Sequence, residues 1–111
     1  MPYYDGGKFS VEHDIIVVTI NYRIGSFGFL YSEADDTING NQGIKDVLLA
    51  LQWIKTNIQE FGGDPDKITI GGESAGAQIT DTLAKSLKYN NADDYFYKSV
   101  SIRVVTGAGR V

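Results

Sequence analysis

The pentapeptide Gly72-Glu73-Ser74-Ala75-Gly76 is the part of the sequence best suited to chemistry. It fits the pattern Gly-x-Ser-x-Gly, in which a serine at a sharp strand-to-helix turn presents its hydroxyl group as a nucleophile. The two glycines allow the strand and the helix to approach without Cβ clashes. The Ala75 N–H then lies at a helix N-terminus, where it can donate to a developing oxyanion. The pattern predicts Ser74 as a catalytic nucleophile.

The residues on either side of the pentapeptide decide how much weight it carries. In a chain with 13 glycines, the alternative is an ordinary glycine-rich turn with a solvated serine. Lys67–Ile70 reads as a short strand directly before the motif. Ala75, Ile79, Leu83 and Leu87, spaced by four residues, predict a helix directly after it. This order is the context that a nucleophilic turn requires, so it favours the catalytic interpretation.

A second helix is predicted upstream of the motif, between two polar loops. Its apolar residues recur at helical spacings of three and four, and they are Val47, Leu51, Ile54, Ile58 and Phe61. Asn41 is the expected N-cap, and Gly62-Gly63 the expected stop. Polar residues dominate 32–42 and 88–94, which we expect to be loops.

Two further strands complete the expected architecture. Ile15–Ile20 is β-branched at every position, which is typical of a central strand covered on both faces. Ser99–Val104 alternates and is the third expected strand. Strands alternating with helices predict an α/β fold with parallel strands and crossover helices. Three strands make only an incomplete sheet.

Composition narrows the range of functions. The 111 residues carry a net charge of −4, and the basic residues are scattered, so nucleic acid is not an expected partner. The longest continuous apolar stretch is five residues, Val47–Leu51, too short to span a membrane. The N-terminal residues lack the features of a secretion signal. The chain has no cysteine and one histidine, which leaves no basis for a disulfide or a zinc site. We expect no cofactor.

The chain resembles the type-B carboxylesterase and cholinesterase family over about residues 3 to 100. The matching stretches are 17–23, Gly25 with 27–30, 40–43 with Asp46, 50–51, 53–54, 61–65, 68–70 and 72–76. The resemblance implies that residues 1–111 are a fragment of one α/β-hydrolase domain, with an incomplete sheet. It also implies a small-molecule carboxylic ester as the substrate of the parent enzyme.

The resemblance assigns roles to individual residues. Ser74 is the nucleophile, and the Ala75 backbone N–H is one oxyanion donor. Glu73 occupies the position of a buried carboxylate that supports the nucleophile. Arg23 and Asp46 correspond to structural polar residues that tie the loop after Ile20 and the following helix to the sheet.

Other parts of the family's machinery are not found in this sequence. In the family the triad acid and histidine lie far downstream of the nucleophile, and no histidine follows Ser74 here. His13 precedes the Ile15 strand, at the opposite edge of a parallel sheet from the turn, so we expect a surface histidine. Gly6-Gly7 lies too close to Asn21 to be the upstream oxyanion loop. Because a serine without a general base is a weak nucleophile, we expect this chain alone to be inactive.

Two alternatives remain open at this point. One is a non-catalytic cholinesterase-like remnant that acts by binding or adhesion. The other is a self-contained small hydrolase that takes its base from another chain. Trp53 lies within the predicted upstream helix, so we expect it in the core rather than in a substrate platform. Localisation and oligomeric state stay open, although the resembled family is often secreted.

Overall fold

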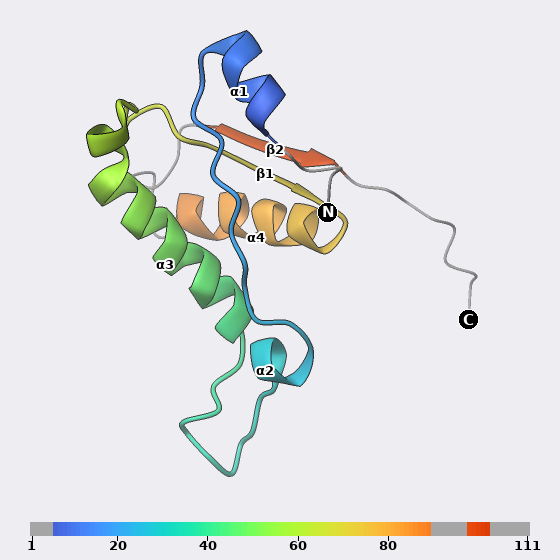
Figure 1. The fold of residues 1–111 in the computed structure, drawn as a ribbon. Coiled ribbons are helices and arrows are strands. Elements are labelled where there is room, and N and C mark those ends of the chain that lie inside the picture. The colour runs from blue at the N-terminus through green and yellow to red at the C-terminus, as the bar shows by residue number, and fades with distance from the viewer. Residues whose placement is uncertain (1–5, 90–97, 103–111) are drawn as a thin grey trace, which may run out of the picture. The chain divides into compact units, whose positions relative to one another are not determined.

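The computed structural model describes residues 6–89 and 98–102, with side chains described for residues 6–86. The chain divides into two compact units, Met1–Gly63 and Asp64–Val111. The first unit contains α1 (Gly7–His13), α2 (Gly25–Phe29), α3 (Gln42–Asn57) and the 3-10 helix η2 (Ile58–Phe61). The second contains β1 (Thr69–Glu73), α4 (Ala75–Tyr89) and β2 (Lys98–Ile102), as Figure 1 shows.

Helix α3 confirms the expected upstream helix. Val47 and Leu51 are buried along one face, and Ile58 is buried where η2 continues the chain. Asn41 is the N-cap residue, although its backbone is left-handed (φ 58°) and its side chain makes no capping hydrogen bond. η2 ends at Gly62, whose φ of 83° favours glycine. The predicted stop is therefore confirmed.

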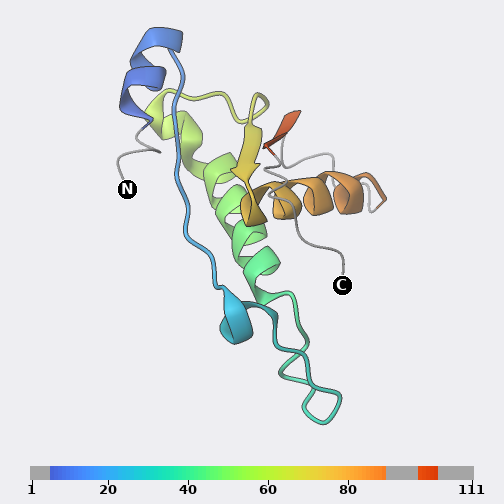
Figure 2. The same ribbon diagram turned by 90° about the vertical axis from the view of Figure 1, so that its right-hand side faces the viewer.

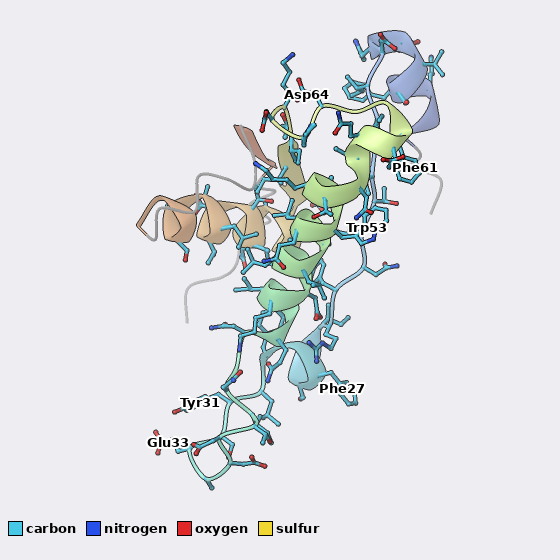
Figure 3. All side chains as sticks on the ribbon, turned by 90° about the vertical axis from the view of Figure 1, so that its left-hand side faces the viewer. Phe27, Tyr31, Glu33, Trp53, Phe61 and Asp64 are labelled. Carbon is cyan, nitrogen blue, oxygen red and sulfur yellow. The ribbon has the colours of Figure 1, made fainter. Side chains whose placement is uncertain are left out.

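The aromatic residues of α3 and η2 depart from the prediction. Trp53 is 54% exposed and Phe61 is 65% exposed, so neither is a core residue of this chain. Their ring centroids lie 6.2 Å apart, and Figure 3 shows both side chains on one side of α3. The heptad-like spacing placed Phe61 on the buried face, but the tighter 3-10 turn of η2 rotates it away.

The predicted strand at Ile15–Ile20 does not form. These residues are extended, but no described residue pairs with them, and their large apolar side chains are partly exposed. Each backbone group of a strand needs a partner on a neighbouring strand, which the segment cannot supply from its own residues. Figures 1 and 2 show it running as a plain tube beside α3. The β-branched run is extended, as predicted, but it forms no strand with any described residue.

A short helix replaces the loop expected after the extended segment. Gly28 of α2 and Gly43 of α3 both pack against the Arg23 carbonyl group. A Cβ on Gly28 would lie 2.6 Å from the Arg23 carbonyl carbon, and a Cβ on Gly43 would lie 2.9 Å from Phe29 Cζ. Both positions therefore require glycine, because the Arg23 carbonyl group lies too close to leave room for a Cβ. This packing brings α2 against the start of α3.

The second unit is a parallel strand–helix–strand arrangement, as predicted. β1 pairs with β2 in parallel, with Thr69 opposite Lys98 and Glu73 opposite Ile102. α4 contacts both strands. Strand β1 begins at Thr69, two residues later than the predicted start at Lys67. It continues through Gly71-Gly72 because pairing with β2 overrides the weak strand propensity of glycine. The last two residues of the predicted third strand lie outside the described residues.

The buried face of α4 differs in part from the predicted stripe. Ile79 and Leu83 are buried as expected, whereas Ala75 is exposed at the first turn. Ala77 and the polar Thr80 are buried instead. The Leu87 side chain lies outside the described residues. The four-residue spacing found the centre of the helix correctly, but the close crossing of the strand shifts the buried face at its N-terminus.

Candidate active site

Ser74 is the single residue between the last residue of β1 and the first residue of α4. Its backbone has a φ of 53°, in the left-handed region, and the residue is exposed to solvent. A non-glycine residue held in this region costs about 1–3 kcal/mol and persists only where its surroundings fix it. Figure 2 shows β1 leading directly into the start of α4. The predicted strand–serine–helix geometry is therefore present.

The two glycines of the motif have different roles. A Cβ on Gly72 would lie 2.8 Å from the Ala77 nitrogen and would also collide with the backbone of Gly76. A Cβ on Gly76 would meet no described atom within 4 Å. The expected close approach of strand and helix is thus carried by Gly72. Gly76 provides the backbone surface against which Gly72 packs.

The first turn of α4 begins at Ser74. The Gln78 N–H donates to the Ser74 carbonyl oxygen at 3.1 Å, which is the first hydrogen bond of the helix. N–H groups of a first turn have no carbonyl partner within the helix and carry the positive end of its dipole. The Ala75 N–H is one of these groups, adjacent to the serine. The arrangement can therefore donate a hydrogen bond to negative charge that develops beside Ser74.

Glu73 and His13, the two other residues considered in the sequence for a role beside the nucleophile, are both exposed. Glu73 is the last residue of β1 and is exposed, not buried as the resemblance implies, so its supporting role stays a prediction. His13 is the last residue of α1 and is exposed, with its ring 4.5 Å from that of Phe9. Its position on the surface is as expected. Among the described residues no group of three acidic or histidine side chains could hold a metal ion.

Arg23 and Asp46 form the polar tie that the resemblance implies. The carboxylate of Asp46 accepts from the Arg23 backbone N–H at 3.0 Å, from Nε at 2.8 Å and from Nη2 at 2.7 Å. The Arg23 side chain, and after it the Arg23 backbone N–H, lowers the pKa of Asp46 to about 2. The pair ties the end of the extended segment to α3. The expected connection to the sheet stays a prediction.

Comparison with known proteins places this geometry in a family. The model of the carboxylesterase family matches residues 1–103. The chain is 42% identical over 110 residues to the para-nitrobenzyl esterase of Bacillus subtilis (strain 168), covering 98% of this chain and 21% of that protein. It is 54% identical over 83 residues to acetylcholinesterase-1 of Trittame loki, covering 75% of this chain and 15% of that protein.

Solved structures agree with the sequence comparison. The structure of a thermophilic pNB esterase superposes with a TM-score of 0.76 at 42% identity, and the match covers 88% of this chain and 20% of that one. The chain thus spans about a fifth or less of the length of these relatives. In the part of the chain that the structure describes, no helix is long and apolar enough to cross a membrane. The fold is part of the α/β-hydrolase fold, and the chain belongs to the carboxylesterase family.

Proposed function

We propose that Ser74 is the nucleophile of a carboxylic ester hydrolase that works through an acyl-enzyme. The backbone of Ser74 carries the proposal, because a φ of 53° at the only residue between β1 and α4 is a costly geometry that a solvated turn serine does not need. The glycine packing at Gly72 supports the same interpretation, since it brings the helix N-terminus directly onto the strand end.

The chemistry follows from the positions of two groups, the Ser74 hydroxyl and the Ala75 N–H, together with a general base from outside residues 1–111. The Ser74 hydroxyl oxygen attacks the ester carbonyl carbon while its proton passes to a general base, and the tetrahedral intermediate then expels the alcohol. The Ala75 N–H donates to the oxyanion of that intermediate, a contribution worth about 3 kcal/mol for a single donor. Water releases the acid in a second attack. The substrate is a small carboxylic ester, as the relatives' printed names indicate for those proteins.

Under the same proposal, residues 1–111 alone do not hydrolyse esters. No histidine follows Ser74 in the 111 residues, and His13 is on the surface of the other unit. Loss of the base alone costs about a million-fold in turnover in a serine hydrolase. Ser74 and the Ala75 N–H thus form the nucleophile half of a site whose base comes from outside residues 1–111.

Fluorophosphonate labelling tests the proposal. The probe is added to native extract, and the Ser74 peptide and the polypeptide that carries it are identified by mass. We expect labelled Ser74 on a polypeptide that also hydrolyses a chromogenic ester, and we expect Ser74→Ala to lose both. Ser86→Ala is the matched control, because Ser86 is an exposed serine on the same helix. A Ser74 peptide that is detected but never labelled would support the non-catalytic binding protein instead.

A second measurement isolates the claim about this chain. The purified 111-residue chain is mixed with the chromogenic ester, and product is followed over time. We expect no turnover above the Ser74→Ala background. Turnover by the purified chain that Ser74→Ala abolishes would show that a base is available to it and would overturn the inactivity claim, while leaving Ser74 as the nucleophile.

A further inference from the structure

Asn39 and Gly40 form an asparagine–glycine pair at the end of the loop that joins α2 to α3. It is the only such pair in the 111 residues. Asn39 is exposed, and Gly40 has a φ of 73°, which residues with a side chain rarely adopt. In such a pair the main-chain nitrogen of the glycine can reach the side-chain amide of the asparagine, because no Cβ on the glycine stands in the way. The pair is therefore a candidate for chemistry within its own main chain.

Lys45 of α3 contacts the side chain of Asn39. Its ammonium group donates a hydrogen bond to Asn39 Oδ1. The main chain of Lys45 is fixed in the first turn of α3, where its N–H donates to the Asn41 carbonyl oxygen at 3.0 Å. A positive charge beside Oδ1 draws electrons from the amide carbon and stabilises negative charge that develops on the oxygen during an attack. Lys45 therefore makes the Asn39 amide a better electrophile.

The main chain of Asn39 is restrained. Asn39 forms an isolated antiparallel bridge with Tyr31, and beside it the Ser32 N–H donates to the Ile38 carbonyl oxygen at 2.9 Å. Closing a ring between Asn39 and Gly40 requires the main chain to turn at this point, so the bridge must open first. A single bridge at the base of a loop opens far more readily than a helix or a sheet core. The bridge therefore slows the ring closure without preventing it.

We propose that Asn39 is a site of intramolecular deamidation and that Lys45 accelerates it. The Gly40 nitrogen forms a bond to Asn39 Cγ while the Cγ–Nδ2 bond breaks, and ammonia leaves with the proton that the Gly40 nitrogen loses. Water then opens the resulting cyclic imide. Addition of water at Cγ gives aspartate, and addition at the main-chain carbonyl carbon gives isoaspartate, whose link to Gly40 runs through the side chain.

The two products affect the loop differently. Aspartate keeps the length of the main chain and can accept from Lys45 in place of the amide, so the bridge to Tyr31 is retained. Isoaspartate adds a carbon atom to the main chain shortly before Asn41, the N-cap residue of α3. The extra atom disrupts the bridge, and the Ser32 N–H should then lose its partner. Conversion to isoaspartate therefore opens the base of the loop.

Ageing of the purified full chain in neutral buffer, followed by mass analysis of its peptides, tests the site. Asn41 is the internal control, because it lies in the same loop but precedes Gln42 instead of a glycine. We expect Asn39 to deamidate at least about tenfold faster than Asn41, because a side chain on the following residue crowds the attack. Equal rates at the two asparagines would contradict the proposal.

Lys45→Met tests the activation, because it removes the donor and keeps an unbranched side chain of good helix propensity. We expect deamidation of Asn39 to slow about two- to tenfold, the factor that corresponds to the ordinary net strength of one hydrogen bond. Lys55→Met is the matched control, because it removes the same charge farther along α3. An unchanged or faster rate in Lys45→Met would refute the role of Lys45, and a faster rate would show that Lys45 only restrains the loop.

Unfolding separates the contact from the local sequence. In concentrated urea the hydrogen bond from Lys45 is lost, so wild type and Lys45→Met should deamidate Asn39 at the same rate. A difference that persists in urea would show that the folded contact is not its cause. Amide exchange in α3 is measured on every variant in buffer, so that loss of folding is distinguished from loss of activation.

The exchange of the Ser32 amide reports on the base of the loop. Freshly purified Asn39→Asp carries the added charge on a main chain of normal length and should keep the protection of this amide. Aged chain, in which enzymatic methylation of isoaspartyl carboxylates detects the product at position 39, should lose that protection. Equal protection in the two samples would overturn the proposed opening of the loop.

Discussion

Asp46 accepts three hydrogen bonds from Arg23, one from its backbone N–H and two from its guanidinium group. A single carboxylate thereby fixes the direction of the main chain and the side chain of the same residue. Gly28 and Gly43 pack against the Arg23 carbonyl on the other side of that residue. Arg23 is therefore held at its N–H, its carbonyl and its side chain, and α2 and α3 are aligned around it.

This relationship predicts how α3 responds to acid. The pKa of Asp46 is about 2 in the folded chain and 3.8 as its ordinary value, so the contribution of the pair is complete above pH 3.8 and is lost as pH falls through 2. Asp46→Asn should reduce the hydrogen-exchange protection of the first turns of α3 at neutral pH. The difference between wild type and Asp46→Asn should then shrink as the pH falls below 3.8 and disappear below pH 2.

Asp81→Asn is the control for this measurement. Asp81 accepts from Lys85 Nζ at 2.7 Å on an exposed face of α4, and exposed pairs at this spacing contribute little. Its effect on exchange should be smaller than that of Asp46→Asn at neutral pH. A pH-independent difference between wild type and Asp46→Asn would contradict the role given to the ion pair.

The two glycines of the serine turn should respond oppositely to alanine. Gly72→Ala places a methyl group against the Gly76 and Ala77 backbone, so we expect a loss of about 1–3 kcal/mol in the opening free energy of α4. Gly76→Ala meets open space in a helix and should gain up to about 1 kcal/mol. Amide exchange in α4 measures both. Equal losses for the two variants would show that both glycines are needed for space.

Gly62 should be required for its backbone conformation alone. A Cβ there would meet no described atom within 4 Å, but the φ is 83°. Gly62→Ala should therefore cost about 1–2 kcal/mol through left-handed strain, and Gly62→Asn should cost less, because asparagine tolerates this region. The exchange of the last amides of α3 and η2 is the measurement. An alanine variant as well protected as wild type would refute the account.

The core of the second unit should depend on Leu83. Leu83 is 2% exposed, whereas Leu49 on α3 is 66% exposed. Leu83→Ala should cost about 2–5 kcal/mol in the opening free energy of α4, through lost burial and a residual cavity. Leu49→Ala, the matched control, should change the protection of α3 by no more than about 0.5 kcal/mol. Similar small effects at both positions would mean that α4 is not packed on its strands.

Local signals predicted the elements whose partners lie nearby in the chain. The helical spacing from Val47 to Ile58 and the glycine at 62 located α3 and η2, because a helix makes its hydrogen bonds within itself. The pentapeptide located the serine turn for a similar reason, since β1 and α4 are joined by one residue. The sharp turn that the motif predicts at Ser74 is present, and the backbone there is left-handed.

Tertiary context decided what the local signals could not. Ile15–Ile20 has the composition of a strand, yet strand formation depends on a neighbour that its own sequence does not specify. Position in the predicted helix placed Trp53 in the core, and helical spacing placed Phe61 there, whereas their exposure depends on which segments cover that side of α3. Catalytic roles depend on groups brought together from distant parts of a chain. The roles of Ser74, Ala75 and Glu73 therefore stay predictions.

The loop between α2 and α3 is closed at its base by an antiparallel bridge between Tyr31 and Asn39. Its tip is tied by the Asp35 carboxylate, which accepts from the Thr37 N–H at 2.9 Å, and Glu33 to Thr37 are all exposed. Figure 3 shows Tyr31 and Glu33 at this end of the first unit. The bridge fixes the distance between the two ends of the loop. An epitope or a fluorophore inserted at the loop tip should therefore leave α2 and α3 undisturbed.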